Sequence, residues 1–198
     1  MGTIPLQHVG NEAEWRQPSR GVVAMAGLII AESSIFSIFV VAYLYYIGRD
    51  VAGPTPREVL EMPYFGTVCL LSSSFFIVLA ERAIEHGKMQ AFKLWWAVTM
   101  LLGAIFLADT GNEWYKLIVH DHLTIHTNLF GTTFYSLVGL HASHVIVGLI
   151  MMLVVLVLGL ARKVEPRHAE RVKVLAMYWH FVDAVWVVVF SVVYIIGR

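Results

Sequence analysis

Five apolar stretches, each close to the length needed to cross a bilayer, constrain this chain more than any other feature of its sequence. The fourth contains no Asp, Glu, Lys or Arg, and each of the others contains at most one. A transmembrane helix needs about 20 largely apolar residues, and a charged side chain at its centre costs ~2.5–3.5 kcal/mol on insertion scales. The sequence therefore predicts five spans, Gly21–Ile47, Tyr64–Ala80, Ala91–Ala108, Leu129–Ala161 and Val174–Gly197.

The connections between these stretches are short, which leaves no room for a soluble domain. We expect an all-α integral membrane protein, a bundle of five transmembrane helices with short loops, formed by residues 21–198. Residues 1–20 form a polar segment that lacks a cleavable signal peptide, and the third helix could extend to Val119. Composition agrees, since 58% of the residues are hydrophobic and 14% are charged, against roughly 45–50% and about 25% in soluble domains.

Several classes of function are excluded by charge and motif content. Lys and Arg together number 14, as do Asp and Glu, so no basic excess indicates a nucleic-acid partner. The single cysteine, Cys69, cannot form an internal disulfide. No nucleophile elbow, phosphate loop, CxxC or HExxH motif is present. We therefore assign no catalytic residue, and the chain is expected to be part of a larger assembly.

The distribution of Lys and Arg between the two sides of the membrane predicts the orientation. The N-terminal segment carries two of these residues, the connection after the second span carries three if Lys93 at the start of the third span is counted with it, and the connection after the fourth span carries five, ten in all, against four on the other side. Positive residues concentrate on the cytoplasmic side. We expect a multi-pass protein of the bacterial inner membrane with a cytoplasmic N-terminus and an external C-terminus.

Ionisable residues lie within three of the predicted spans. Glu32 lies in the first, His141 and His144 are three residues apart in the fourth, and His180 and Asp183 are three residues apart in the fifth. A spacing of three allows a side-chain contact on a helix. Because such groups normally face the protein interior, we expect a buried polar layer that joins spans one, four and five.

Two interpretations of this layer remain open from the residues alone. The groups could simply pair with one another and hold the helices in register, or Glu32 could have a role near proton movement. Haem ligation by His141 or His144 with His180 is a third and weaker hypothesis. His120, His122 and His126 gather in the loop after span three, but without the four-ligand spacing of a zinc site, so we interpret them as surface or interfacial histidines.

These spans resemble subunit III of the haem–copper terminal oxidases, in its bacterial five-helix form. The first span has Ala31-Glu32-Ser33-Ser34-Ile35-Phe36 in place of the family's Ser-Glu-x-x-x-Phe-Phe helix, and GPTPREVLEMPYFGTVCLLSSS is similar to the family's Pro-Thr-Pro connection. GNEWYKLI places Glu113 on the family glutamate. GLHASHVIVG is close to the family's Gly-x-His-x-x-His-Val pattern, and YWHFVDAVW matches Tyr-Trp-His-Phe-x-Asp-x-Val-Trp. The resemblance covers the chain from about Gly21, although Ser34 and Ile35 replace bulkier family residues.

The resemblance implies an accessory subunit, non-catalytic by itself, of a proton-translocating oxidase that reduces O2 to water. Haem and copper are then expected in partner subunits and not in this chain. The implied partners are subunit I in direct contact, subunit II, a small subunit IV, and phospholipids held in a cleft between two helix groups. The implied roles are steady proton uptake and resistance to inactivation during turnover.

The resemblance also implies roles for individual residues. Glu32 is the buried carboxyl of the kind that reacts with carbodiimides. The cleft and its polar layer are expected to include Glu113, His141, His144, Trp179, His180 and Asp183. A family member associated with nitric oxide reductase is the main alternative, and an independent haem-carrying electron carrier or transporter is the other.

Overall fold

The computed structural model describes residues 19–49 and 53–197. Within them, five helices are long and apolar enough to cross a membrane, which confirms the predicted fold class. The elements are α1 (Arg20–Tyr46), α2 (Pro56–Val59), α3 (Tyr64–Glu85), α4 (Met89–Val119), α5 (Leu129–Leu160), η1 (Pro166–His168), α6 (Ala169–Phe190) and η2 (Ser191–Ile196). The predicted N-terminal segment lies outside the described residues except for its last two.

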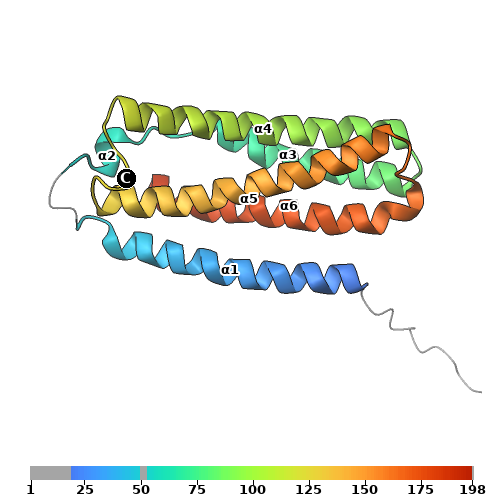
Figure 1. Ribbon diagram of the computed structural model, residues 1–198, viewed down its shortest axis with the longest axis horizontal. Helices are drawn as coiled ribbons and strands as arrows, with labels where there is room; N and C mark the ends of the chain where they lie inside the picture. Colours follow the sequence, from blue (N-terminus) through green and yellow to red (C-terminus); the bar gives the residue numbers. More distant parts are fainter. Residues whose placement is uncertain (1–18, 50–52, 198) are drawn as a thin grey trace, which may run out of the picture.

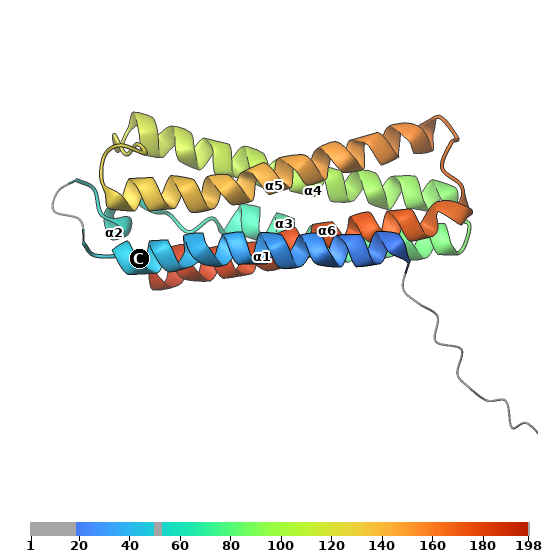
Figure 2. The ribbon, with the colours of Figure 1, turned by 60° about the horizontal axis from the view of Figure 1, so that its bottom comes forward.

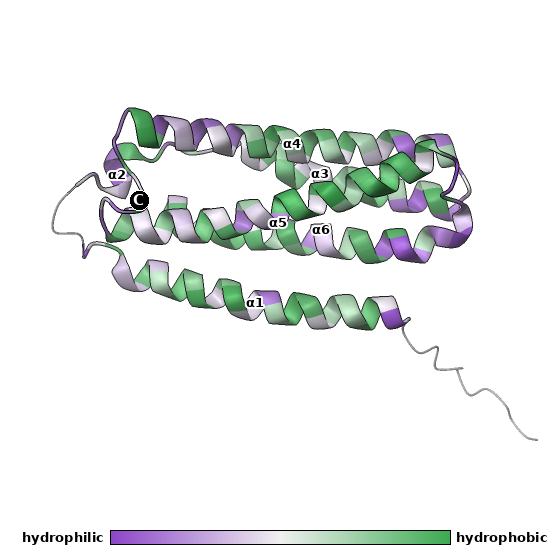
Figure 3. Ribbon diagram, in the orientation of Figure 1, coloured by the Kyte–Doolittle hydropathy of each residue, from purple (hydrophilic) through white to green (hydrophobic). Residues whose placement is uncertain are grey.

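The long helices alternate in direction and lie nearly parallel to one another (Figure 1). Three of them differ in length from the predicted spans. α3 runs on to Glu85, α4 reaches Val119, as the sequence allowed, and α6 begins at Ala169. Polar residues at these ends can remain helical because they lie beyond the apolar middle of each span. Figure 3 shows the apolar colour along the helix middles and the polar colour gathered at the helix ends.

α1 lies along one side of the bundle and packs chiefly against α5 and α6 (Figures 1 and 2). Most of its surface is exposed, and only Phe36 and Tyr43 are buried on it. Its exposed serines satisfy their own hydroxyl groups, since Ser33, Ser34 and Ser37 each donate a hydrogen bond to the carbonyl four residues earlier. α1 therefore presents a broad apolar face away from the other helices.

The other four helices meet around Trp179 of α6, whose side chain is fully buried. A Cβ built on Gly103 of α4 would lie 2.7 Å from its ring, and one built on Gly148 of α5 would lie 2.9 Å away. Small residues let membrane helices approach closely, and here the two glycines make room for the indole. Its Nε1 donates a hydrogen bond of 2.8 Å to Ser73 Oγ of α3, so one side chain contacts three neighbouring helices.

The connection before α3 is ordered by its own side chains. Glu58 Oε2 accepts a hydrogen bond of 2.9 Å from the backbone N–H of Thr55, at the start of α2. This bond from Thr55 lowers the pKa of Glu58. At the start of α3, Asp109 of α4 accepts a hydrogen bond of 3.1 Å from the backbone N–H of Gly66. A carboxylate is favourable at a helix N-terminus, so α4 caps α3 across the bundle.

Candidate functional site

The contact that attaches α1 to the bundle at mid-length joins Glu32 to His144 of α5. Glu32 Oε2 lies 3.2 Å from His144 Nε2, and the two side chains are 24% and 14% exposed. The other ring nitrogen, His144 Nδ1, lies 2.8 Å from the carbonyl oxygen of Leu140. The sequence predicted that spans one and four share a polar layer, and these two residues are the ones brought together.

The hydrogen-bond partners of His144 limit the arrangements that satisfy both of its ring nitrogens. A carbonyl oxygen only accepts, so Nδ1 must carry a hydrogen. Nε2 then either donates as an imidazolium to a Glu32 carboxylate or accepts from a protonated Glu32 hydroxyl. Both arrangements place a single proton between the two residues and leave the pair with no net charge. The pair is thus able to hold a proton at the depth of the apolar helix centre.

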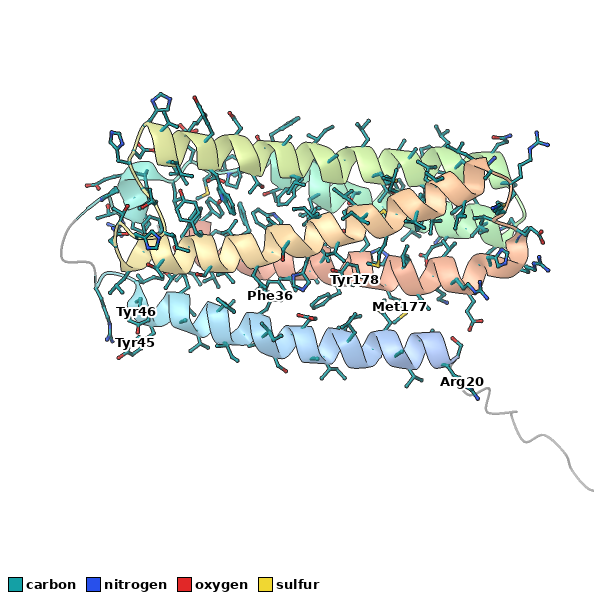
Figure 4. The ribbon with its side chains drawn as sticks, in the orientation of Figure 1. Arg20, Phe36, Tyr45, Tyr46, Met177 and Tyr178 are labelled. Atoms are coloured by element: carbon teal, nitrogen blue, oxygen red, sulfur yellow. The ribbon has the colours of Figure 1, made fainter. Side chains whose placement is uncertain are left out.

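Aromatic rings cover the Glu32–His144 pair on the side that faces the bundle. Phe36, one turn along α1 from Glu32, is 4% exposed, and its ring centroid lies 5.0 Å from that of His144. In Figure 4, Phe36 lies in the space between α1 and the helices beside it, with Tyr178 also facing that space. Tyr178 donates a hydrogen bond of 3.2 Å to the carbonyl of His144, which ties α6 to α5 at this point.

A second polar group joins α6 to α3 through Ser74. Ser74 Oγ lies 3.1 Å from His180 Nδ1 and donates a short hydrogen bond to Asp183 Oδ2. The spacing of His180 and Asp183 predicted that they could contact one another, but both bind the serine instead. Asp183 is buried, and its Oδ1 atom has no hydrogen-bond partner within residues 19–49 and 53–197. Ser74 was not among the residues predicted for the layer.

α3 supplies hydroxyl groups to α6 at two further levels. Trp179 donates to Ser73, and Trp186 donates to Thr67 Oγ1 over 3.1 Å. The two tryptophans are seven residues apart, and the two acceptors are six apart. Because the helices are antiparallel, matching intervals of about two turns place donor opposite acceptor at both levels. This matched spacing is the sequence signal that could have identified α3 as the partner of α6.

His141 is buried to 1% exposure, and neither ring nitrogen has a hydrogen-bond partner among the described residues. Its ring instead lies among aromatic rings, with centroids 5.0 Å from Trp186, 5.8 Å from Phe106 and 6.5 Å from Phe36. A buried polar group without a partner is costly. His141 therefore differs from His144, which is one turn away on the same helix and has a hydrogen-bond partner at each ring nitrogen.

Glu113 lies apart from the groups described so far. Both of its carboxylate oxygens accept from the hydroxyl of Tyr194 in η2, over 3.0 and 2.9 Å. Tyr194 follows Asp183 by eleven residues, which corresponds to roughly 16 Å along a helix. The structure thus places Glu113 near the C-terminal end of the bundle, where it also lines a carboxylate-rich pocket with Glu58, Glu61, Asp109 and Asp121.

An apolar groove of about 410 Å³ lies between α1 and α6, next to Phe36. Its lining consists of Ser33, Phe36, Ser37, Val40, Val41, Phe181, Ala184, Val185, Val188 and Val189. His120, His122 and His126, in the loop between α4 and α5, are exposed. Across residues 19–49 and 53–197, no three or more His, Cys, Asp or Glu residues are grouped so that they could hold a metal ion.

Comparison with known proteins gives a consistent result. Residues 26–198 match the family model described as cytochrome c oxidase subunit III. The chain is 35% identical over 170 residues to cytochrome c oxidase subunit 3 of Bacillus sp. (strain PS3), covering 84% of this chain and 81% of that one. It is 36% identical to the Synechocystis cytochrome c oxidase subunit 3, over 85% and 72% of the two chains. It is 32% identical to the cytochrome bo(3) ubiquinol oxidase subunit 3 of Pseudomonas aeruginosa, over 85% and 81%.

Proposed function

The chain belongs to the cytochrome c oxidase subunit III family of the haem–copper oxidases, and from that premise we propose that it is an accessory, non-catalytic subunit of a proton-translocating terminal oxidase. The observation that carries the proposal is the match to the family model from residue 26 to the C-terminus. The complex reduces O2 to water, and haem and copper reside in its other subunits. The proposal covers oxidases that take electrons from cytochrome c and from quinol, since relatives of both kinds match.

The partners follow from the same proposal. The chain flanks subunit I directly, and subunit II and a small subunit IV complete the complex. It resides in the bacterial inner membrane with a cytoplasmic N-terminus and an external C-terminus. The excess of Lys and Arg in the connections after spans two and four supports this orientation.

The groove between α1 and α6 is the proposed site of a bound phospholipid chain. Its lining is mainly Val and Phe side chains with two serines, and both serine hydroxyls already donate to carbonyls of their own helix. Such a surface favours an acyl chain over a polar ligand. Phe36 separates the groove from His144, so a lipid there also shields the Glu32–His144 pair from water.

The proposed role of the pair is to support proton uptake and resistance to turnover inactivation in the complex. The single proton between Glu32 and His144 can shift from one residue to the other without changing the net charge of the pair. This property suits a site that buffers a proton within an apolar layer. His180, Asp183 and Trp179 are proposed to hold α6 against α3, which keeps the α6 wall of the groove in place.

Purification through an affinity tag on this chain tests the assignment. Extraction from its own membranes in mild detergent should recover a haem-containing subunit I and oxygen-consuming activity with the chain. Glu32→Gln should leave haem content and the initial oxygen-consumption rate unchanged, remove carbodiimide labelling of the chain, and reduce the number of turnovers before inactivation. Glu113→Gln, at the far end of the bundle, is the matched control. Loss of the first turnover in Glu32→Gln would contradict an accessory role.

A further inference from the structure

A second pocket, of about 280 Å³, lies between the start of α4 and the end of α5. These helix ends lie side by side at the end of the bundle where α1 begins (Figures 1 and 2). The lining is Met89, Gln90, Lys93, Gly159, Arg162 and Val164. The groove proposed above lies on α1 and α6, so the two share no residue.

Lys93 is the charged residue that enters the apolar part of α4. Its side chain is partly buried, and its stem lies over α5, because a Cβ built on Gly159 would be 3.9 Å from Lys93 Cγ. Long basic side chains bury their stems along apolar surface and keep the charge at the interface. In the part of the chain that the structure describes, Lys93 forms no ion pair and no hydrogen bond to the last carbonyls of α5.

Arg162 occupies a backbone position that normally belongs to glycine. Its φ angle is +58°, and its N–H bonds to Gly159 O while that of Lys163 bonds to Leu158 O. This pair of bonds is the Schellman ending of a helix, in which the left-handed residue is usually Gly. An arginine there strains the backbone in a way that a glycine would not. Arg162 also has no ion-pair partner among residues 19–49 and 53–197.

The start of α4 contributes Met89 and Gln90 to the same pocket, and the N–H of Met89 is already bonded to Gly87 O. Its N-cap residue, Lys88, provides no side-chain cap. The N–H groups of the first helical turn have no partner within their own helix, and this end of the helix dipole favours negative charge. Two cations that form no ion pair in the described part of the chain therefore line one pocket together with the start of α4.

We propose that this pocket binds the phosphate of an anionic phospholipid such as phosphatidylglycerol. Arg162 and Lys93 pair with the phosphate oxygens, and the acyl chains run along the exposed apolar side chains next to them, Leu94 and Leu160. Basic pockets between transmembrane helices are suited to acidic headgroups. The pocket at the opposite end of the bundle is lined by five carboxylates and one lysine, so the preference for anionic lipid belongs to one end only.

Native mass spectrometry of the purified complex, with added phosphatidylglycerol or phosphatidylcholine, tests the proposal. The wild type should retain phosphatidylglycerol about tenfold better or more, the order expected for two basic side chains at a membrane surface. Lys93→Gln with Arg162→Gln should abolish the preference. Arg167→Gln with Arg171→Gln removes two charges at the same end but outside the pocket and should keep it. A wild type without a preference, or equal loss in both double variants, overturns the proposal.

Two further arms make the test specific. Arg162→Gly relieves the left-handed strain, so it should fold at least as well as the wild type while its preference for phosphatidylglycerol falls several-fold. A preference unchanged in this variant would remove Arg162 from the site. Competition with inorganic phosphate separates a lipid from a free anion, because a lipid held by both headgroup and chains should not be displaced. If these experiments contradict the anionic-lipid site, the proposed lipid groove between α1 and α6 and the assignment to an oxidase still stand.

Discussion

Glu32 Oε2 and His144 Nε2 lie 3.2 Å apart across the α1–α5 interface, and His144 Nδ1 is already committed to the carbonyl of Leu140. A hydrogen bond between these two atoms then requires a proton on one of the two residues. It also attaches the helix that is otherwise the most exposed in the bundle. A change at either residue should therefore affect both the attachment of α1 and the protonation of the layer.

The two histidines of α5 should respond in opposite ways to the same substitution. His144→Phe leaves Glu32 without its partner, and stranding a buried polar group costs about 1–3 kcal/mol. His141→Phe removes a side chain that has no hydrogen-bond partner and keeps its contacts with Phe106 and Trp186. We expect the thermal midpoint of the purified complex to fall in His144→Phe and to stay or rise in His141→Phe. A larger loss in His141→Phe would show that its nitrogens have a partner in the assembled complex.

The hydrogen bonds through Ser74 predict how the effects of substitutions at Ser74 and Asp183 combine. Ser74→Ala should weaken the α3–α6 contact nearly as much as Asp183→Ala, because each change removes one partner of the Ser74–Asp183 hydrogen bond. Their combination should cost less than the sum of the two, since contacts in one network are not additive. The measurement is the fraction of this subunit retained in the purified complex for the two single variants and the double. Additive losses would contradict the shared network.

Gly103 and Gly111 of α4 provide a matched pair for the contact with Trp179. A Cβ on Gly103 would lie 2.7 Å from the indole, whereas one on Gly111 meets nothing within 4 Å. Trp179 is fully buried and bonded to Ser73, so it cannot move aside easily. Gly103→Ala should destabilise the protein by about 1–3 kcal/mol through overpacking. Gly111→Ala should be neutral or stabilising through its helix propensity, as thermal unfolding in detergent would measure.

Cysteine labelling tests the orientation. In a Cys69→Ser background, a membrane-impermeant maleimide added to spheroplasts should label Ile125→Cys, in the loop between α4 and α5. Arg167→Cys, in the connection before α6, should be labelled only after the membrane is permeabilised. The physical basis is the bias of Lys and Arg toward the second of these connections. Labelling of both positions in intact spheroplasts would mean that the second loop is external or the spheroplasts leak, and reversal of the pattern would invert the topology.

The five spans, their order and the ionisable residues within them could be predicted from the sequence, because a bilayer imposes length and apolarity on each helix separately. The family could also be identified from local motifs, since residues such as Trp179, His180 and Asp183 stand close together on one helix. Even the extension of α4 to Val119 follows from the uninterrupted helical stretch around Glu113. All of these properties belong to single segments of the chain.

Only the tertiary structure decided which polar groups meet. A spacing of three residues placed His180 and Asp183 on one face of α6, but it could not show that Ser74 of α3 lies between them. Nor could the spacing show that His144 meets Glu32 while His141 lies among aromatic rings. The two histidines are three residues apart, so their side chains differ both in direction around α5 and in position along it. The room for Trp179 at Gly103 and Gly148, and the pocket that Lys93 and Arg162 both line, depend on how helices cross. Such distances are set by packing between segments remote in sequence, which no local pattern records.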